Sequence, residues 1–111
     1  MTTTATVLIP AKEAEAAQTT QYTCGVLQTI LDNFTITNTT AANAKISINI
    51  IPSGGAVGDA NCITHEKTLT PSQAYRAYEV IGHILEAGEI ISTLADTANA
   101  LTIRASGREI T

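Results

Sequence analysis

Within residues 45–51, polar and apolar side chains alternate from Lys45 to Ile50. One face would carry isoleucines and the other polar residues: Ile46, Ile48 and Ile50 against Lys45, Ser47 and Asn49. Successive side chains of a β-strand point to opposite faces of its sheet, so this pattern predicts a strand with one buried face. The apolar face of such a strand needs a second layer to cover it, which makes a layered β-fold the first expectation.

The same period of two recurs in short runs along the chain. We expect further strands at residues 26–38, 62–69, 89–94 and 101–106, with Gly107 interrupting the last one. Clusters of Pro, Gly, Asn and Asp lie between these runs and mark turns. The total is about seven or eight short strands, which is typical of an antiparallel sandwich or barrel. Helical segments do not alternate with the strands, which argues against a βαβ fold.

Residues 73–85 fit two interpretations. Thr70 followed by Pro71 looks like the start of a helix, and a helix would align an apolar stripe. The stripe would contain Ala74, Ala77, Tyr78, Ile81 and Leu85. A strand would instead place Tyr75 and Ala77 on one face, and Gly82 disfavours a long helix.

The N-terminal residues 1–20 differ in character from the rest of the chain. Residues 6–9 could form a short strand ended by Pro10, and residues 12–18 contain good helix formers without an apolar stripe. A helix without an apolar face has nothing to pack against. We therefore predict an N-terminal arm at residues 1–20, ordered against a partner, and a β-sandwich domain at residues 21–111.

Length and charge exclude several classes of protein. A chain of 111 residues corresponds to one domain and is long enough to bury a core. Only six Lys and Arg residues are present and the formal net charge is −4, so we expect no direct nucleic-acid partner. No apolar run approaches membrane-spanning length and no signal peptide is recognisable, so we expect no membrane partner and synthesis in a cytoplasm.

The sequence offers little that could support catalysis. Cys24 and Cys62 have no metal-ligand spacing and are expected to be free thiols packed as small hydrophobic side chains. His65 and His83 are the only histidines, and neither belongs to a zinc or nucleophile motif. The loop at residues 52–55 lacks the lysine and helix of a phosphate loop. We predict a protein that is not an enzyme and binds no metal or cofactor.

Two groups of residues are candidates for a contact surface. Tyr75, Arg76 and Tyr78 place two tyrosines and an arginine within four residues, and Arg104 and Arg108 lie near the C-terminus. Arginine and tyrosine are enriched at protein interfaces. The polar faces of the expected strands carry Thr, Ser and Asn more than charged residues, which is compatible with burial in an assembly.

Several short sequence segments occur in a fixed order along the chain. A strand ends in an Asn-Thr-Thr turn at residues 38–40, and an alternating stretch runs into Pro-Ser-Gly-Gly at residues 52–55. A break follows before the strand after Thr70, then Ile-Leu-Glu-Ala-Gly-Glu-Ile-Ile at residues 84–91 and an alternating strand that ends in Ser-Gly at 106–107. Over about residues 21–111 this order resembles a widespread group of small phage and prophage proteins. In that group residues 73–85 correspond to a strand and a short connection, so we expect a strand there, with room for one helical turn at residues 79–85.

This resemblance implies a jelly-roll-like β-sandwich and a structural role in a virion. The expected function is that of a capsid decoration or cement protein, which binds the outside of the head shell and bridges subunits of the major capsid protein. The expected state is a homo-oligomer, preferably a trimer, and deletion of residues 2–18 is expected to weaken shell binding without unfolding the sandwich. A tail- or fibre-associated module is an alternative. A carbohydrate-binding sandwich for host attachment is another, although the chain has no Trp, one Phe and three Tyr for sugar stacking.

Overall fold

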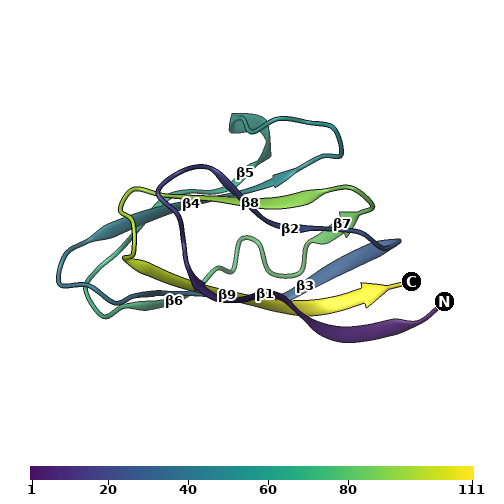
Figure 1. The fold of residues 1–111 in the computed structure, drawn as a ribbon, viewed down its shortest axis with the longest axis horizontal. Helices are drawn as coiled ribbons and strands as arrows, with labels where there is room; N and C mark the ends of the chain where they lie inside the picture. Colours follow the sequence, from purple (N-terminus) through teal and green to yellow (C-terminus); the bar gives the residue numbers. More distant parts are fainter.

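The computed structural model describes all residues 1–111 and folds them into two antiparallel sheets packed face to face (Figure 1). Nine strands and one short 3₁₀ helix follow in chain order: β1 (Thr3–Glu13), β2 (Thr19–Thr23), β3 (Gln28–Asn38), β4 (Ala44–Ile51), η1 (Asp59–Asn61), β5 (Cys62–Leu69), β6 (Ala74–Arg76), β7 (Ile84–Glu86), β8 (Ile90–Ala95) and β9 (Leu101–Ile110). The all-β sandwich is confirmed, with nine strands where about seven or eight were predicted. No helix has the length needed to cross a bilayer.

The strand order is that of a jelly roll. Sheet A has the order β1-β9-β3-β6, with β7 also paired to β3, and sheet B has the order β2-β8-β4-β5. Strands pair from the two chain ends inward: β1 with β9, β2 with β8, β3 with β6 and β7, and β4 with β5. The chain is thus one long hairpin that bends between β4 and β5 and rolls up, so that β9 also pairs with β3 and β8 with β4. With β6 and β7 taken as one interrupted strand, this is the jelly-roll arrangement of paired Greek keys.

The core lies between the inner faces of the two sheets. The predicted alternation of residues 45–51 is observed in β4, where Ile46 and Ile48 are fully buried and Ser47 and Lys45 face outward. Sheet A covers them with side chains of β3 and β9: Leu31, Phe34, Ile36, Leu101, Ile103 and Ala105. Each fully buried large apolar side chain stabilises the fold by about 1.5–3 kcal/mol. The sandwich therefore rests on the period of two that the sequence displays.

Residues 73–85 form a strand in two parts, and the helix interpretation is wrong for this segment. β6 and β7 both pair with β3, and a turn at residues 77–83 separates them. The turn contains one helix-like hydrogen bond, from Ile81 N–H to Ala77 O (3.2 Å). Gly82 adopts a left-handed φ of 88° and donates its N–H to Leu31 O (2.7 Å), which returns the chain to sheet A. The only helical turn in the region thus precedes most of residues 79–85.

The structure corrects the prediction of a separate N-terminal arm at residues 1–20. β1 pairs with β9 from Thr3 to Glu13, and Leu8 and Ile9 are buried in the core. The strand passes through Pro10 because β1 is at the edge of sheet A, where a missing N–H can face away from the ladder. The sequence indicates only residues 6–9 of this strand, because bulges between Val7 and Ile9 and between Ile9 and Lys12 break its period of two. The sandwich therefore includes β1 and most of residues 1–20.

Candidate interaction surface

The three arginines of the chain lie on the outer face of sheet A. Thr35 pairs with Arg76 on one side and with Arg104 on the other, which places both arginines in one row. Arg108 lies in a second row, opposite Ile30. Residues in one row point to the same side of a sheet, and all three arginines are exposed. We call Arg76, Arg104, Arg108 and the neighbouring Tyr78 the arginine face.

Arg108 forms a bidentate ion pair with Asp32. Its Nε and Nη2 donate to the two carboxylate oxygens at 2.9 and 2.8 Å. Asp32 is the extra residue of a bulge in β3 between Leu31 and Asn33, which turns its side chain outward toward β9. Hydrogen bonds from Arg108 lower the pKa of the Asp32 carboxyl below its usual value. The pair is exposed to solvent, so it fixes the orientation of Arg108 more than it stabilises the fold.

Arg76 is oriented by two contacts on the same face. Its Nε donates to Asn33 Oδ1 at 3.1 Å, and its guanidinium carbon lies 5.7 Å from the centre of the Tyr78 ring. A cation above an aromatic ring is attracted by the ring's electron density. Tyr78 is 68% exposed, so its ring is accessible to another molecule. Arg104 has no ion-pair partner and remains free to bind a carboxylate of another molecule.

Tyr75 lies apart from the arginine face. It pairs with the buried Ile36 and therefore points toward the interior side of sheet A, where it packs at the margin of the core. Lys67 Nζ of β5 lies 4.7 Å from its ring centre, and its hydroxyl donates to Glu79. Burial and the Glu79 carboxylate raise the pKa of Tyr75 to about 12. Tyr75 thus connects the edges of the two sheets, and of the five predicted contact residues the structure gathers Arg76, Tyr78, Arg104 and Arg108 on one surface.

Apolar side chains surround Arg108, and these are site residues that the sequence did not identify. Ile84 is 52% exposed and lies opposite Ile30, in the same row as Arg108. Val7 of β1 is 44% exposed and lies opposite Ser106, in the next row. The alternation of residues 26–38 could have placed Ile30 on the outer face. Ile84 and Val7 join it only through strand pairing, which no local pattern reveals.

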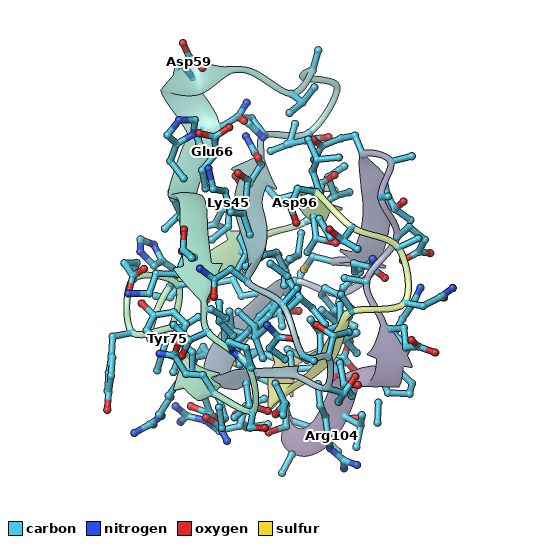
Figure 2. The ribbon with its side chains drawn as sticks, turned by 90° about the vertical axis from the view of Figure 1, so that its left-hand side faces the viewer. Lys45, Asp59, Glu66, Tyr75, Asp96 and Arg104 are labelled. Atoms are coloured by element: carbon cyan, nitrogen blue, oxygen red, sulfur yellow. The ribbon has the colours of Figure 1, made fainter.

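The outer face of sheet B has a different chemistry. It contains a hollow of about 260 Å³ whose lining includes Glu66, Asp96 and Lys45. Figure 2 shows Asp59 and Glu66 at one end of the molecule and Arg104 at the opposite end. The Asp96 carboxylate accepts a hydrogen bond from the Lys45 backbone N–H (2.8 Å), so part of this charge is used within the fold. The arginines and this acidic cluster are therefore on opposite faces of the sandwich.

A cysteine and a histidine meet on this second face without forming an activated nucleophile. Cys62 Sγ lies 3.8 Å from His65 Nδ1, next to Asp59. Burial and the nearby carboxylates raise the pKa of the Cys62 thiol, whereas a nucleophilic thiol needs a lowered pKa. Cys24 is buried, and its Sγ accepts a hydrogen bond from Thr29 Oγ1 at 3.2 Å. His83 is in the β6–β7 turn, and no three metal-binding side chains converge anywhere in the structure.

Comparisons with known proteins identify no relative. No family model, no curated protein and no solved structure matches this chain. The class defined by the fold and the surface is a small jelly-roll sandwich with an arginine-bearing face.

Proposed function

We propose that this chain is a non-enzymatic structural protein of a phage virion, a decoration or cement protein that binds the outside of the capsid. The observation that carries the proposal is the segregation of all three arginines, with the exposed Tyr78, on one face of an otherwise acidic protein. Arg and Tyr are the residue types that contribute most at protein interfaces, and apolar neighbours such as Ile84 add area that gains by burial. The jelly-roll order agrees with the resemblance, because viral capsid proteins are among those that use it.

The proposed partner is the major capsid protein, contacted through the arginine face. Arg104 is the one arginine of this face that has no partner within the protein, so it would bind a carboxylate on the shell. Arg76 and Arg108 are held in place by Asn33 and Asp32, so little side-chain freedom would be lost on binding. Copies that touch several shell subunits would add modest contacts into a strong attachment.

The number of copies per virion tests this proposal directly. Quantitative mass spectrometry of purified particles, normalised to the major capsid protein, should give a simple ratio close to one to one. A small copy number that matches the symmetry of the tail would assign the protein to the tail instead. Absence from the particle would refute a virion role of either kind.

The arginine face is tested by a pair of charge-matched variants. Arg104→Ser should weaken binding to undecorated shells at least tenfold, because one charge-assisted hydrogen bond contributes about 1.5–3 kcal/mol. Lys45→Ser removes the same charge from the opposite face and should leave binding unchanged. Sedimentation of protein with shells measures both. Equal losses for the two variants would show that net charge, and not this face, governs attachment.

A further inference from the structure

The free edge of β1 is the only sheet edge that lacks protection against pairing with another chain. Sheet A ends at β1 on one side and at β6 and β7 on the other, and sheet B ends at β2 and β5. Exposed edges are normally blunted by charge, bulges, proline or short length. β6 and β7 have three residues each, and β2 has five with a bulge. β5 has two bulges and carries charged residues at Glu66 and Lys67.

β1 divides into a protected and an unprotected half. From Val7 onward it contains two bulges, Pro10, Lys12 and Glu13. The first half, Thr3–Val7, has regular pairing with β9 and no charge, proline or bulge. In Figure 1 this half lies at the lower right border of the molecule, beside β9. The unprotected stretch is therefore confined to five residues.

The backbone groups on this free edge can be assigned from the ladder. Thr2 and Thr111 exchange both backbone hydrogen bonds (3.0 and 2.9 Å), so Thr2 points toward β9. Residues of an antiparallel strand alternate in this respect, so Thr3, Ala5 and Val7 direct their N–H and C=O groups away from the sheet. None of the backbone hydrogen bonds of turns, loops and caps involves these groups. The free backbone groups of these three alternate residues can therefore form hydrogen bonds with a new strand.

We propose that two copies of this protein pair through the Thr3–Val7 segments of β1, antiparallel and about a two-fold axis at Ala5. Ala5 would lie opposite Ala5 of the second copy, and Thr3 opposite Val7 of the second copy. These three pairs provide about six backbone hydrogen bonds. A second copy is the occupant that the sequence favours. The segment is uncharged, so two antiparallel copies of it can pair without placing like charges opposite each other. The bulge after Val7 ends the regular part of β1, and the proposed pairing between the two copies ends at the same residue.

The result is one continuous sheet that spans both copies and joins their two arginine faces side by side. This dimer stands independently of the proposed function, and it differs from the trimer expected from the resemblance. Its formation requires only the chain itself, so it is testable in solution without shells.

The test is the mass of the purified protein by analytical ultracentrifugation over a wide concentration series. The wild type should approach twice its chain mass of 11.6 kDa. Ala5→Lys places two like charges opposite each other at the axis and should give a monomer. Ala98→Lys, the same change in the exposed β8–β9 turn, is the matched control and should remain dimeric.

A charge-swap mixture separates lost pairing from a folding defect. Ala5→Lys mixed with Ala5→Glu should restore the dimer, since opposite charges then meet at the axis. Ala5→Pro, which removes one outward N–H without adding charge, is the second variant if Ala5→Lys fails to fold. A wild type that stays monomeric, a mass of three chains, or a dimer that persists in the folded Ala5 variants would each overturn the proposal. The copy number per virion depends on none of these results.

Discussion

Gly107 lies where the two neighbours of β9 leave no room for a side chain. It pairs with Leu31 of β3 and Thr6 of β1, and a Cβ at this position would be 2.0 Å from Ile30 O and 3.0 Å from Leu8 Cδ1. Gly107→Ala should therefore destabilise the protein by about 3 kcal/mol, the upper part of the range for overpacking. Urea unfolding measures the loss. Gly25→Ala, whose Cβ would meet nothing within 4 Å, should change stability by less than about 0.5 kcal/mol.

Tyr22 gives the protein a specific response to alkaline pH. Its hydroxyl donates to Glu109 Oε2 at 2.6 Å, and burial together with this carboxylate raises the pKa of Tyr22 to about 12. Below the ordinary value of 10.0 the phenol is neutral in both states. Between pH 10 and about 12 the unfolded state loses its proton first, so the free energy of unfolding falls through this window.

Tyr22→Phe should reduce the decrease in the free energy of unfolding over this pH range. The variant loses a hydrogen bond and should be less stable at neutral pH, but its decline from pH 10 to 12 should be shallower than that of the wild type. Urea unfolding at stepped pH provides the comparison. Tyr75, whose pKa is also raised to about 12, is present in both proteins, so the difference isolates Tyr22. Parallel pH curves would contradict the assignment.

Residue types identified most of the candidate surface, but their orientation was not predictable. Arg76, Tyr78, Arg104 and Arg108 were selected because Arg and Tyr are common at interfaces, and they do share a face. Tyr75 was selected on the same ground, yet pairing with Ile36 turns it toward the core. The direction of a side chain depends on which neighbour its strand meets, and for β6 that neighbour is about 40 residues away in sequence.

At the scale of elements, β1 is the strand whose role changes most between sequence and structure. Ile9 is fully buried, so Ile9→Ala should destabilise the sandwich by about 2–5 kcal/mol. Thermal or urea unfolding measures this loss. Val57→Ala, in the exposed loop after β4, is the control and should have little effect. An Ile9→Ala variant as stable as the control would show that β1 contributes nothing to the core.

Deletion of residues 2–18 should abolish cooperative unfolding, contrary to the expectation drawn from the sequence. The deletion removes the partner of β9 along the edge of sheet A and uncovers the core residues beneath Leu8 and Ile9. Near-ultraviolet circular dichroism and the unfolding transition would report the loss. A truncated protein with a sharp transition would restore the arm interpretation.

The strands whose bounds were predicted most accurately are those flanked by clear turn signals. Residues 45–51 and 62–69 correspond to β4 and β5 almost to the residue. The strand at residues 101–106 was predicted to stop at Gly107, but β9 continues to Ile110 because that glycine lets Ile30 O approach closely. For β1 only a short strand at residues 6–9 was predicted, and the split between β6 and β7 was missed, because bulges and a tight turn interrupt the alternation there.

At the scale of the whole molecule, the two ends of the chain are neighbours. Thr2 and Thr111 are joined by two backbone hydrogen bonds, and the long loop at residues 52–61 lies at the bend of the rolled hairpin. A circular permutant with a short linker between the native ends and new ends between Gly54 and Gly55 should fold with near-native stability. New ends between Leu31 and Asp32, inside β3, should prevent folding. Circular dichroism and unfolding transitions compare the two permutants.

The adjacency of the termini also sets the mechanical behaviour of the molecule. Because β1 and β9 are antiparallel and their ends meet, a force applied through the two termini loads the hydrogen bonds of this pair one after another. The hydrogen bonds between β1 and β9 then break in sequence, so the strands separate at low force. A force carried along the strands of sheet A would load many bonds at once in shear. A sandwich of this kind therefore resists force better when the force acts along the strands of sheet A than when it acts through the two termini.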